Sequence, residues 1–485
     1  MTHQHHKNIV SVVLALAALT ACGSSEETTP STQARSSSPT TVTAIETTDA
    51  AADTTERPPT ASSETSSPVS ASATTARWRD DVEAACDEFI TGLDSLPEDD
   101  GTAADIAAFI EAFREMAAGV PRVQDIEAPA EQQAAIADLD AIVTEADGWL
   151  AAAAEAAAAG DDATARTALD RAFSGYGLIG GTLAIAGARC GDAEPARAAA
   201  AALNVPVQFG PWQIAAGFGS IWVSEMHGAR VVRLDPETGD VIATIDVGEQ
   251  PFKLQPADDR IWVRLESRYI AIDPASDAIV AELAKADVGP EANRSWALDS
   301  AMWICDGRHL HRYDPTTLEA VAVIDLAVDC GQVYATDELV VAWSYNEDDG
   351  ESGNSAAAFV NPATNQVFAT VDLPVDVGVP VVLDNAVFFA GWGGSKGVVV
   401  DRASWTVTDT PDLGAVTKGS LIVTDGSSIF VPTDCCPKDV LVVDAATFEV
   451  TASIEPLGNN ALAVLDGSLW TADLDFGLVQ RFDVS

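Results

Sequence analysis

The chain has 485 residues, of which 74 are Asp or Glu and 26 are Lys or Arg, so its formal net charge is −48. Phosphate groups are bound by clustered Lys and Arg, and this charge therefore argues against a nucleic acid as a partner. It also argues against a protein that lies flat on anionic lipid, and it otherwise favours a well-solvated surface.

The N-terminus carries a short targeting pattern. The apolar stretch Ile9–Leu19 is too short to span a bilayer stably. The sequence that follows, Leu19-Thr20-Ala21-Cys22-Gly23, resembles the lipobox of bacterial lipoproteins, with Leu19, Ala21 and Cys22 as the matching residues. In that family the signal is cleaved before the cysteine, and the cysteine thiol receives a diacylglyceryl group.

This resemblance implies that residues 1–21 are a signal peptide and that Cys22 is lipidated. Two or three acyl chains anchor a protein stably. We therefore expect attachment to the cell membrane, with everything after Cys22 on the extracytoplasmic face. The alternative is an ordinary secretory signal in which the cysteine is accidental.

Residues 22–76 are predicted to be a disordered tether. From Ser24 to about Thr75 the sequence consists mainly of Ser, Thr, Ala and Glu, with almost no large apolar side chains. Such a composition buries too little surface to offset the loss of chain entropy. About 50 flexible residues give a root-mean-square reach of roughly 40 Å.

Residues 77–195 are rich in alanine and place apolar side chains at helical spacing. We expect a four-helix spacer domain, and a loose similarity to Ala-rich modules of actinobacterial lipoproteins points the same way. The expected helices are Asp81–Leu93, Asp105–Ala118, Ala130–Ala159 and Ala163–Ala188. The last expected helix contains four residues without side chains, which favour close helix packing or a kink over a ligand site: Gly175, Gly177, Gly180 and Gly181.

The seven cysteines fit an oxidising compartment. Six remain after Cys22 is set aside, and their positions suggest one pairing among 15. Two of them bracket the helical region, two flank a single repeat of the C-terminal region, and two are adjacent. The predicted pairs are Cys86 with Cys190, Cys305 with Cys330, and Cys435 with Cys436.

A sequence motif recurs through residues 203–485. Each copy has an aromatic residue, then about ten residues, then a segment like Arg233-Leu234-Asp235-Pro236. The aromatic positions are Trp222, Trp262, Trp303, Trp343, Phe388, Phe430 and Trp470. The acid or amide positions are Asp235, Asp273, Asp314, Asn361, Asp401, Asp444 and Asp483, spaced 38, 41, 47, 40, 43 and 39 residues apart. A period near 41 built from short strands predicts a seven-bladed β-propeller.

The repeated residues are interpreted as structural. In the first copy the expected strands are Gln213–Gly217, Ser220–Ser224, Arg230–Leu234 and Val241–Val247. The acid then falls in the turn between the third and fourth strands, where its side chain bonds local backbone. The aromatic residue falls on the second strand, where it packs between neighbouring sheets.

The seventh copy ends after its third strand. The segment Leu203–Phe209 precedes the first copy and alternates apolar and polar residues. We expect it to supply the missing outer strand beside Leu478–Phe482 and so to close the ring. Pro206 is tolerable there because the strand lies at an edge.

The first copy of the motif resembles the YVTN or YncE-like propeller repeat, and it is also similar to streptogramin lyase and quinoprotein-like repeats. The matching segment is Val231-Val232-Arg233-Leu234-Asp235-Pro236-Glu237-Thr238-Gly239. The resemblance covers roughly residues 205–485. It implies the fold, but propellers of this kind host many activities.

Function in a propeller is expected on the face formed by the loops between second and third strands and by the connections between blades. In an acidic chain, a cluster of cations on this face could attract an anionic ligand. The alternative is an ordinary charged loop surface. The candidate ligand-face residues are Glu225, His227, Lys253, Arg264, Arg268, Arg294, Arg308, Trp392, Lys396 and Lys418.

Two enzyme classes with similar repeats are the alternatives to a binding role. Cys435-Cys436 would form a vicinal disulfide, as in some quinoprotein dehydrogenases, but Thr244-Ile245 and Val323-Ile324 stand where those enzymes place a docking tryptophan. His227 beside Glu225 is the one pair similar to the His and acid of streptogramin lyases. No catalytic residue, metal ligand or cofactor is assigned on this basis.

The sequence therefore favours a lipid-anchored binding or scaffold protein, and the alternative is a streptogramin lyase-like or quinoprotein-like propeller enzyme, that is, a lyase or an oxidoreductase. Its expected parts are a tether, a helical spacer and a propeller. The expected partners are the membrane, through the lipid anchor, and an envelope protein, glycan or small molecule, through the loop face.

Overall fold

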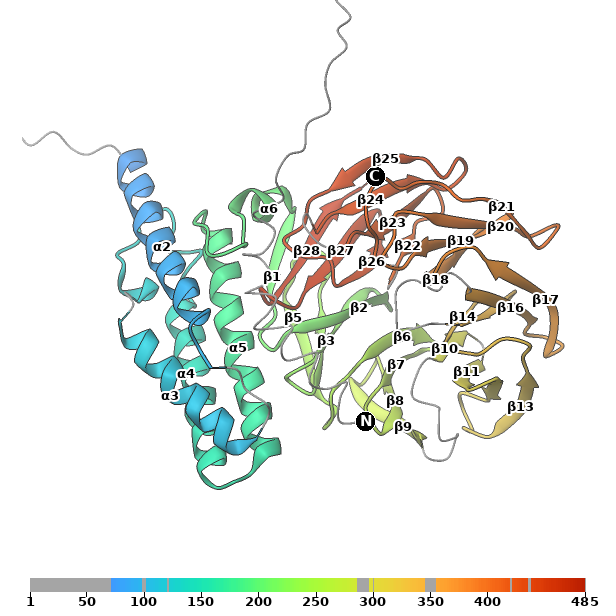
Figure 1. Ribbon diagram of the computed structural model, residues 1–485, viewed down its shortest axis with the longest axis horizontal. Coiled ribbons are helices and arrows are strands. Elements are labelled where there is room, and N and C mark those ends of the chain that lie inside the picture. The colour runs from blue at the N-terminus through green and yellow to red at the C-terminus, as the bar shows by residue number, and fades with distance from the viewer. Residues whose placement is uncertain are drawn as a thin grey trace, which may run out of the picture. The chain divides into compact units, whose positions relative to one another are not determined.

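The computed structural model describes residues 71–97, 102–119, 122–285, 296–299, 301–344, 355–418, 421–434 and 438–484 (Figure 1). Residues 77–485 form one unit by their internal contacts. This unit contains a helical region followed by a seven-bladed antiparallel propeller, as predicted. None of the described helices combines the length and the apolar character needed to cross a membrane.

The helical region has four long helices and one short one. Their bounds are α2 Ala71–Leu93, α3 Ala103–Gly119, α4 Leu139–Ala158, α5 Asp162–Ile185 and α6 Pro195–Ala200, with a 3-10 turn η1 at Val123–Asp125. Helix α2 starts inside the segment predicted to be tether. Helix α4 starts nine residues later than expected, because residues 130–138 form successive turns, such as Ala135 N to Gln132 O and Leu139 N to Ile136 O.

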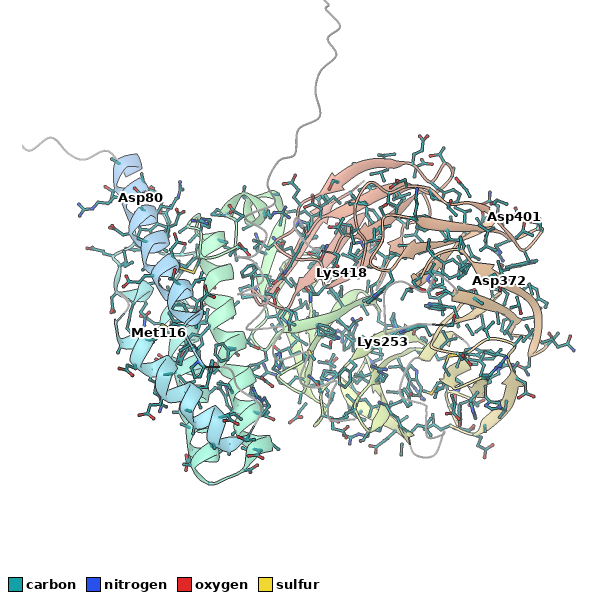
Figure 2. All side chains as sticks on the ribbon, in the orientation of Figure 1. Asp80, Met116, Lys253, Asp372, Asp401 and Lys418 are labelled. Carbon is teal, nitrogen blue, oxygen red and sulfur yellow. A yellow bond between two sulfur atoms is a disulfide. The ribbon has the colours of Figure 1, made fainter. Side chains whose placement is uncertain are left out.

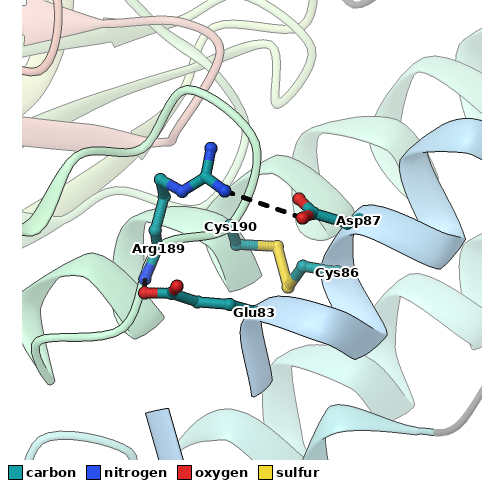
Figure 3. Close-up of a disulfide and its surroundings, with 5 residues drawn as sticks. All are labelled: Glu83, Cys86, Asp87, Arg189 and Cys190. Atoms are coloured by element: carbon teal, nitrogen blue, oxygen red, sulfur yellow. Dashed lines mark hydrogen bonds and ion pairs between the residues drawn. A yellow bond between two sulfur atoms is a disulfide. The ribbon is translucent and has the colours of Figure 1, made fainter. Parts of the chain in front are cut away.

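The helices pack around aromatic and aliphatic side chains. Phe113 is buried and makes ring contacts with Phe89, Phe173 and Tyr176 at centroid distances of 5.9, 5.7 and 5.2 Å. The disulfide between Cys86 and Cys190 joins α2 to the segment after α5, as predicted (Figure 3). It therefore ties the two ends of the helical region together.

The propeller consists of seven four-stranded sheets, all paired antiparallel. Six of them are formed by consecutive strands. Blades 1 and 2 comprise β2 Pro211–Gly217, β3 Ser220–Glu225, β4 Arg230–Leu234 and β5 Val241–Asp246, then β6 Lys253–Ala257, β7 Arg260–Arg264, β8 Arg268–Asp273 and β9 Ala278–Ala284.

Blades 3 and 4 comprise β10 Trp296–Asp299, β11 Ala301–Asp306, β12 His309–Tyr313 and β13 Ala320–Asp325, then β14 Gln332–Ala335, β15 Val340–Trp343, β16 Ser355–Asn361 and β17 Gln366–Leu373. Blades 5 and 6 comprise β18 Val377–Val382, β19 Ala386–Gly391, β20 Gly397–Asp401 and β21 Thr406–Asp409, then β22 Val423–Thr424, β23 Ser428–Pro432, β24 Val440–Asp444 and β25 Val450–Ile454.

Blade 7 closes the ring. Its strands are β26 Ala461–Leu465, β27 Ser468–Asp473, β28 Leu478–Asp483 and, at the outer edge, β1 Leu203–Pro206. Val205 lies opposite Val479 in the register of β1 and β28. The predicted closure is confirmed, although the strand ends at Pro206. Val207 N continues the contact by donating to Gly477 O at 2.7 Å.

The repeated residues take the structural roles predicted for them. All seven aromatic side chains are at most 1% exposed: Trp222, Trp262, Trp303, Trp343, Phe388, Phe430 and Trp470. In the turn after the third strand, Asp235 Oδ1 accepts from Glu237 N at 2.8 Å and from Thr238 N at 3.0 Å. Asp314 and Asp444 repeat this arrangement.

The arginine of the repeated sequence motif links neighbouring blades. Arg233 lies 5.0 Å over the Trp222 ring, and its Nη1 donates to Pro274 O in the turn of blade 2 at 2.6 Å. Arg312 makes the equivalent contacts with Trp303 and with Pro362 O of blade 4. A cation over an aromatic face and a bond to the next turn explain why Arg, Asp and Pro recur together.

Candidate functional site on the loop face of the propeller

The loop face is formed by the loops between second and third strands and by the connections between blades. Described helical residues contact this face at blades 6, 7 and 1. Arg197 of α6 donates to Pro456 O at 2.8 Å and forms an ion pair with Asp439 at 2.9 Å, both in blade 6 or the connection after it. Helix α5 contacts the corresponding loops of blades 7 and 1, so the helical region is not a free spacer.

Helix α5 approaches the backbone of blade 7 through glycine. A Cβ on Gly177 would lie 2.0 Å from Asp475 O, and one on Gly181 would lie 2.5 Å from Phe476 O. Gly175 likewise allows a close approach to α4, because a Cβ on Gly175 would lie 2.8 Å from the Cβ of Ala146. These glycines serve close packing, as the sequence indicated, although two of them face the propeller rather than another helix.

An arginine–aromatic stack joins α4 and α5 to blade 1. The guanidinium of Arg171 lies 4.5 Å from the ring centroid of Trp149, and that of Arg230 lies 4.6 Å from the ring of Phe209. Trp149 meets Phe209 edge to face at 6.1 Å. Arg171 Nε also donates to His227 O at 2.8 Å, which fixes the loop of blade 1 against α5.

Glu225 and His227, two of the predicted ligand-face residues, lie within this contact. Glu225 is 2% exposed; its Oε2 accepts from Arg230 Nε at 2.6 Å and its Oε1 accepts from Phe209 N at 3.4 Å. Burial, followed by the charge of Arg171, lowers the pKa of His227 to about 4. Both side chains therefore serve the packing of the helices on blade 1, and the bonds of the Glu225 carboxylate in the described structure go to Arg230 and Phe209.

A second buried polar cluster lies where blades 6 and 7 meet. Lys438 Nζ pairs with Asp475 Oδ2 at 2.6 Å, and Asp473, which is 1% exposed, accepts from Phe476 N at 2.5 Å. Burial raises the pKa of Asp473 to about 6, and Lys438 opposes this shift. Asn459 donates to Thr433 O at 2.9 Å across the seam between the blades. The sequence did not single out Asp473 or Asn459.

Three of the predicted cations belong to blade 2. Lys253 and Arg264 are opposite each other in the register of β6 and β7. Burial, followed by the charge of Arg264, lowers the pKa of Lys253 to about 8. Arg268 pairs with Glu249 and also donates to Val247 O at 3.0 Å, so its charge is already matched locally.

Trp392 stands on a rigid loop of blade 5. Its side chain is 40% exposed. Its N donates to Asp376 O at 2.8 Å, and Gly393 N donates to Thr417 O at 3.0 Å. The buried Thr417 hydroxyl donates to Gly391 O at 2.6 Å and so holds both ends of the loop. Gly391 admits no side chain, because a Cβ would lie 2.4 Å from Lys396 O.

Lys396 and Lys418 flank the same loop. Lys396 pairs with Asp412 at 3.2 Å on the surface. Lys418 follows Thr417 directly and its N donates to Pro432 O at 3.1 Å. Burial and the charge of Lys438 lower the pKa of Lys418. The loop of Trp392 and Lys396 thus contacts the backbone of Thr417, whereas the Lys418 side chain lies within electrostatic reach of Lys438, Asp434, Asp473 and Asp475. Lys418 and Lys253 both lie toward the middle of the ring (Figure 2).

Blade 3 carries the remaining candidates. The disulfide between Cys305 and Cys330 forms as predicted, and it joins the end of β11 to the connection between blades 3 and 4. Arg308 beside it forms an ion pair with Asp329 at 3.9 Å. His309 and His311 each face one acid, Asp325 at 3.4 Å and Asp306 at 3.6 Å. Across the described ranges of the chain, no three His, Cys, Asp or Glu side chains are grouped closely enough to hold a metal ion.

Some predicted residues fall outside the described ranges. These are Cys22, Arg294, Cys435 and Cys436. The other candidates divide into two sets. Glu225 and His227 lie under the helices, and the rest lie on blades 2, 3, 5 and 6.

The sequence matches no family model and no curated protein. Among solved structures, the chain is similar to the hydrazine synthase of Kuenenia stuttgartiensis (13% identity, TM-score 0.46, covering 57% of this chain and 97% of that one). It is also similar to BamB from Moraxella catarrhalis (17%, 0.40, 55% and 83%) and to the Pan2 WD40 domain of Neurospora crassa (8%, 0.44, 56% and 88%). At these identities the likeness is one of fold.

Proposed function

We propose that this protein is a lipid-anchored, extracytoplasmic binding or scaffold protein. The part of the loop face around Trp392 would recognise an envelope protein or glycan. The propeller fold is compatible with binding and scaffold roles. The observation that supports a binding role most directly is the hydrogen-bonded loop of blade 5, which carries an exposed tryptophan and Lys396.

Tryptophan dominates binding energy in many interfaces because it offers a large apolar area and loses little entropy. The loop of Trp392 is already ordered by Thr417 and Asp376, so partner binding would not have to order it. Lys396 on the same loop is a half-exposed surface cation paired with Asp412, and it suits a partner with an anionic group near an apolar or sugar surface. The helices that contact blades 6, 7 and 1 leave this loop exposed.

The extracytoplasmic part of the proposal rests on the two disulfides and on the lipobox-like sequence. Structural disulfides persist in oxidising compartments. Mass spectrometry of the mature protein tests the anchor directly. We expect an N-terminal Cys22 that carries a diacylglyceryl group, and an unmodified Cys22 would refute anchoring.

Site-specific photo-crosslinking of the full chain in its native envelope tests the loop face. A photoreactive residue in place of Val416, which is 47% exposed beside Thr417, should yield a defined crosslinked product that Trp392→Ala reduces at least tenfold, since loss of a hot-spot tryptophan costs about 2 kcal/mol or more. The matched control is Phe218→Ala. Phe218 is also 40% exposed, but it lies in the turn between β2 and β3 on the opposite face.

Both variants should keep the thermal stability of the parent protein. Equal crosslinking by the parent and Trp392→Ala would contradict the proposed face. Equal loss in both variants would point to a general effect of removing an exposed aromatic residue, and it would contradict the proposal as well.

A further inference from the structure

The helical region contains a cavity of about 500 Å³ that is partly open to solvent. It lies among α2, α3, α4 and α5, on residues separate from the loop face. Its walls include Phe89, Phe113, Val143, Leu150 and Ile179, together with the disulfide of Cys86 and Cys190. A volume between 300 and 1,000 Å³ with mostly apolar walls is typical of small-molecule sites, whose few polar groups orient the ligand.

The polar groups of this cavity gather at one end. Asp147 Oδ1 accepts from the Tyr176 hydroxyl at 2.8 Å, and Asp147 Oδ2 accepts from Arg122 at 3.0 Å. Arg114 also lines the cavity. Its charge reaches the same tyrosine, because it acts to lower the pKa of Tyr176 against the larger raising effects of burial and Asp147.

This end of the cavity has an excess of positive charge. Arg122 is matched by Asp147, whereas Arg114 forms no ion pair or side-chain hydrogen bond with any residue that the structure describes. Burial and Asp147 raise the pKa of Tyr176, so the phenol stays protonated and neutral. Two guanidiniums therefore stand beside one carboxylate at the rim of an apolar chamber.

We propose that this cavity binds an amphipathic carboxylate, with its hydrocarbon part among the phenylalanines and its carboxylate at Arg114. The guanidinium of arginine suits a carboxylate because its planar N–H groups match the two oxygens. A neutral alcohol would leave Arg114 unmatched. An alkylammonium would add a third cation beside Arg114 and Arg122.

Isothermal titration of the full chain tests this with ligands of one length: decanoate, decyl phosphate, decanol and decylammonium, each below its micelle-forming concentration. Decanoate should bind one to one and roughly tenfold or more tighter than decanol, since a hydrogen bond to a charged group is stronger than a neutral one. Decyl phosphate distinguishes a carboxylate ligand from a phosphate-headed lipid. Tighter binding of the phosphate would overturn the assignment to a carboxylate.

Two variants locate the site. Arg114→Met should bring decanoate close to the affinity of decanol, while Arg77→Met, which removes another exposed charge, on α2 and outside the lining of the cavity, should not. Ala117→Trp should fill the cavity and abolish binding of both ligands. Equal binding of all four ligands, or decanoate binding that survives both Arg114→Met and Ala117→Trp, would overturn the proposal.

The test does not depend on Ala117→Trp, which is the more disruptive of the two variants. Arg114 is exposed, so its replacement should leave the circular dichroism spectrum unchanged, and the comparison of ligands uses the parent protein. The Trp392 experiment concerns other residues, so the two proposals can fail independently.

Discussion

Arg171 shows how one side chain can attach a helix to a propeller. Its guanidinium stacks on Trp149, lies 5.8 Å from the Phe209 ring and donates to His227 O. Desolvation lowers the pKa of Arg171, but arginine stays charged at any ordinary pH. The cost of bringing this cation close to Arg230 is reduced by Asp246 and Glu225, which both act to raise the pKa of Arg171.

This arrangement predicts an acid-sensitive contact. His227 has a pKa of about 4 in the folded protein and about 6.5 in an unfolded chain. Between these values the unfolded chain binds a proton that the folded protein does not, so the free energy of unfolding decreases as the pH falls from about 6.5 to about 4. The loss from His227 should reach roughly 3 kcal/mol at most.

Urea unfolding at several pH values measures this effect. His227→Gln should show a shallower loss of stability below pH 6.5, because glutamine does not titrate. The raised pKa of Asp473 acts in the opposite sense, since it favours the folded state as the pH falls toward 4, and it is common to both proteins. Parallel curves for the two proteins would contradict the assignment of the effect to His227.

Helix α5 is the element that joins the two parts of the unit. Its Gly177 and Gly181 are four residues apart and lie on one face, where the backbone of blade 7 leaves no room for a Cβ. Glycine weakens a helix, so two glycines facing a backbone at this distance mark a close contact. The same helix uses Tyr176 and Ile179 to line the cavity of the helical region.

Replacing one of these glycines with alanine should therefore lower the free energy of unfolding, although alanine normally stabilises a helix relative to glycine. Gly177→Ala should destabilise the protein by about 1 to 3 kcal/mol through overpacking, despite the better helix propensity of alanine. Gly148→Ala in α4 is the control, because a Cβ there meets nothing within 4 Å. It should stabilise the protein by about 0.5 to 1 kcal/mol.

Hydrogen exchange can localise the effect. In Gly177→Ala, the amides of α5 and of the loop around Asp475 and Phe476 should exchange faster, while those of blades 3 and 4 should not change. Stabilisation by Gly177→Ala, or faster exchange spread over the whole propeller, would show that the contact is not where the structure places it.

The sequence predicted elements better than it predicted contacts between them. Trp222 and Asp235 recur because each blade needs the same core residue and the same turn, so their spacing encodes the number of blades. The missing outer strand was predictable from the incomplete seventh copy. By contrast, the late start of α4 was missed, because Ile136 and Leu139 keep a helical spacing across a segment that forms turns.

The loop face could be predicted only in part. Topology assigns the loops to one face, which is why Trp392, Lys396 and Lys418 were chosen together. Whether a loop stays exposed depends on how the helices dock, and docking is set by shape over distant parts of the chain. The glycines of α5 were the available signal, but their pattern does not say which partner they approach, so Glu225 and His227 were placed on an open surface.

At the scale of the whole molecule, the two described disulfides constrain very different lengths of chain. Cys86 and Cys190 are 104 residues apart, whereas Cys305 and Cys330 are 25 apart. If crosslinks act by reducing the entropy of the unfolded chain, the longer loop contributes more, about 4.7 against about 3.5 kcal/mol. The first bond also joins α2 to the segment that leads into α6.

Paired serine substitutions test this comparison. Replacing Cys86 and Cys190 should lower the free energy of unfolding by about 1 kcal/mol more than replacing Cys305 and Cys330. Denaturant titration of both variants under oxidising conditions gives the difference. A larger loss from the shorter loop would show that local packing around Cys305, which is fully buried, outweighs chain entropy.

The pairing of β1 with β28 sets an order of events during synthesis. Leu203 pairs with Arg481, which is made 278 residues later, so β1 must wait for almost the entire propeller before it finds its partner. Contacts this distant in sequence form slowly, and an unpaired strand invites pairing with another chain. Arg171 and Gly177 of the helical region, which are made before the propeller, contact the loops of blades 1 and 7 at the same place. Assembly would therefore finish at the seam where the chain's early and late segments meet.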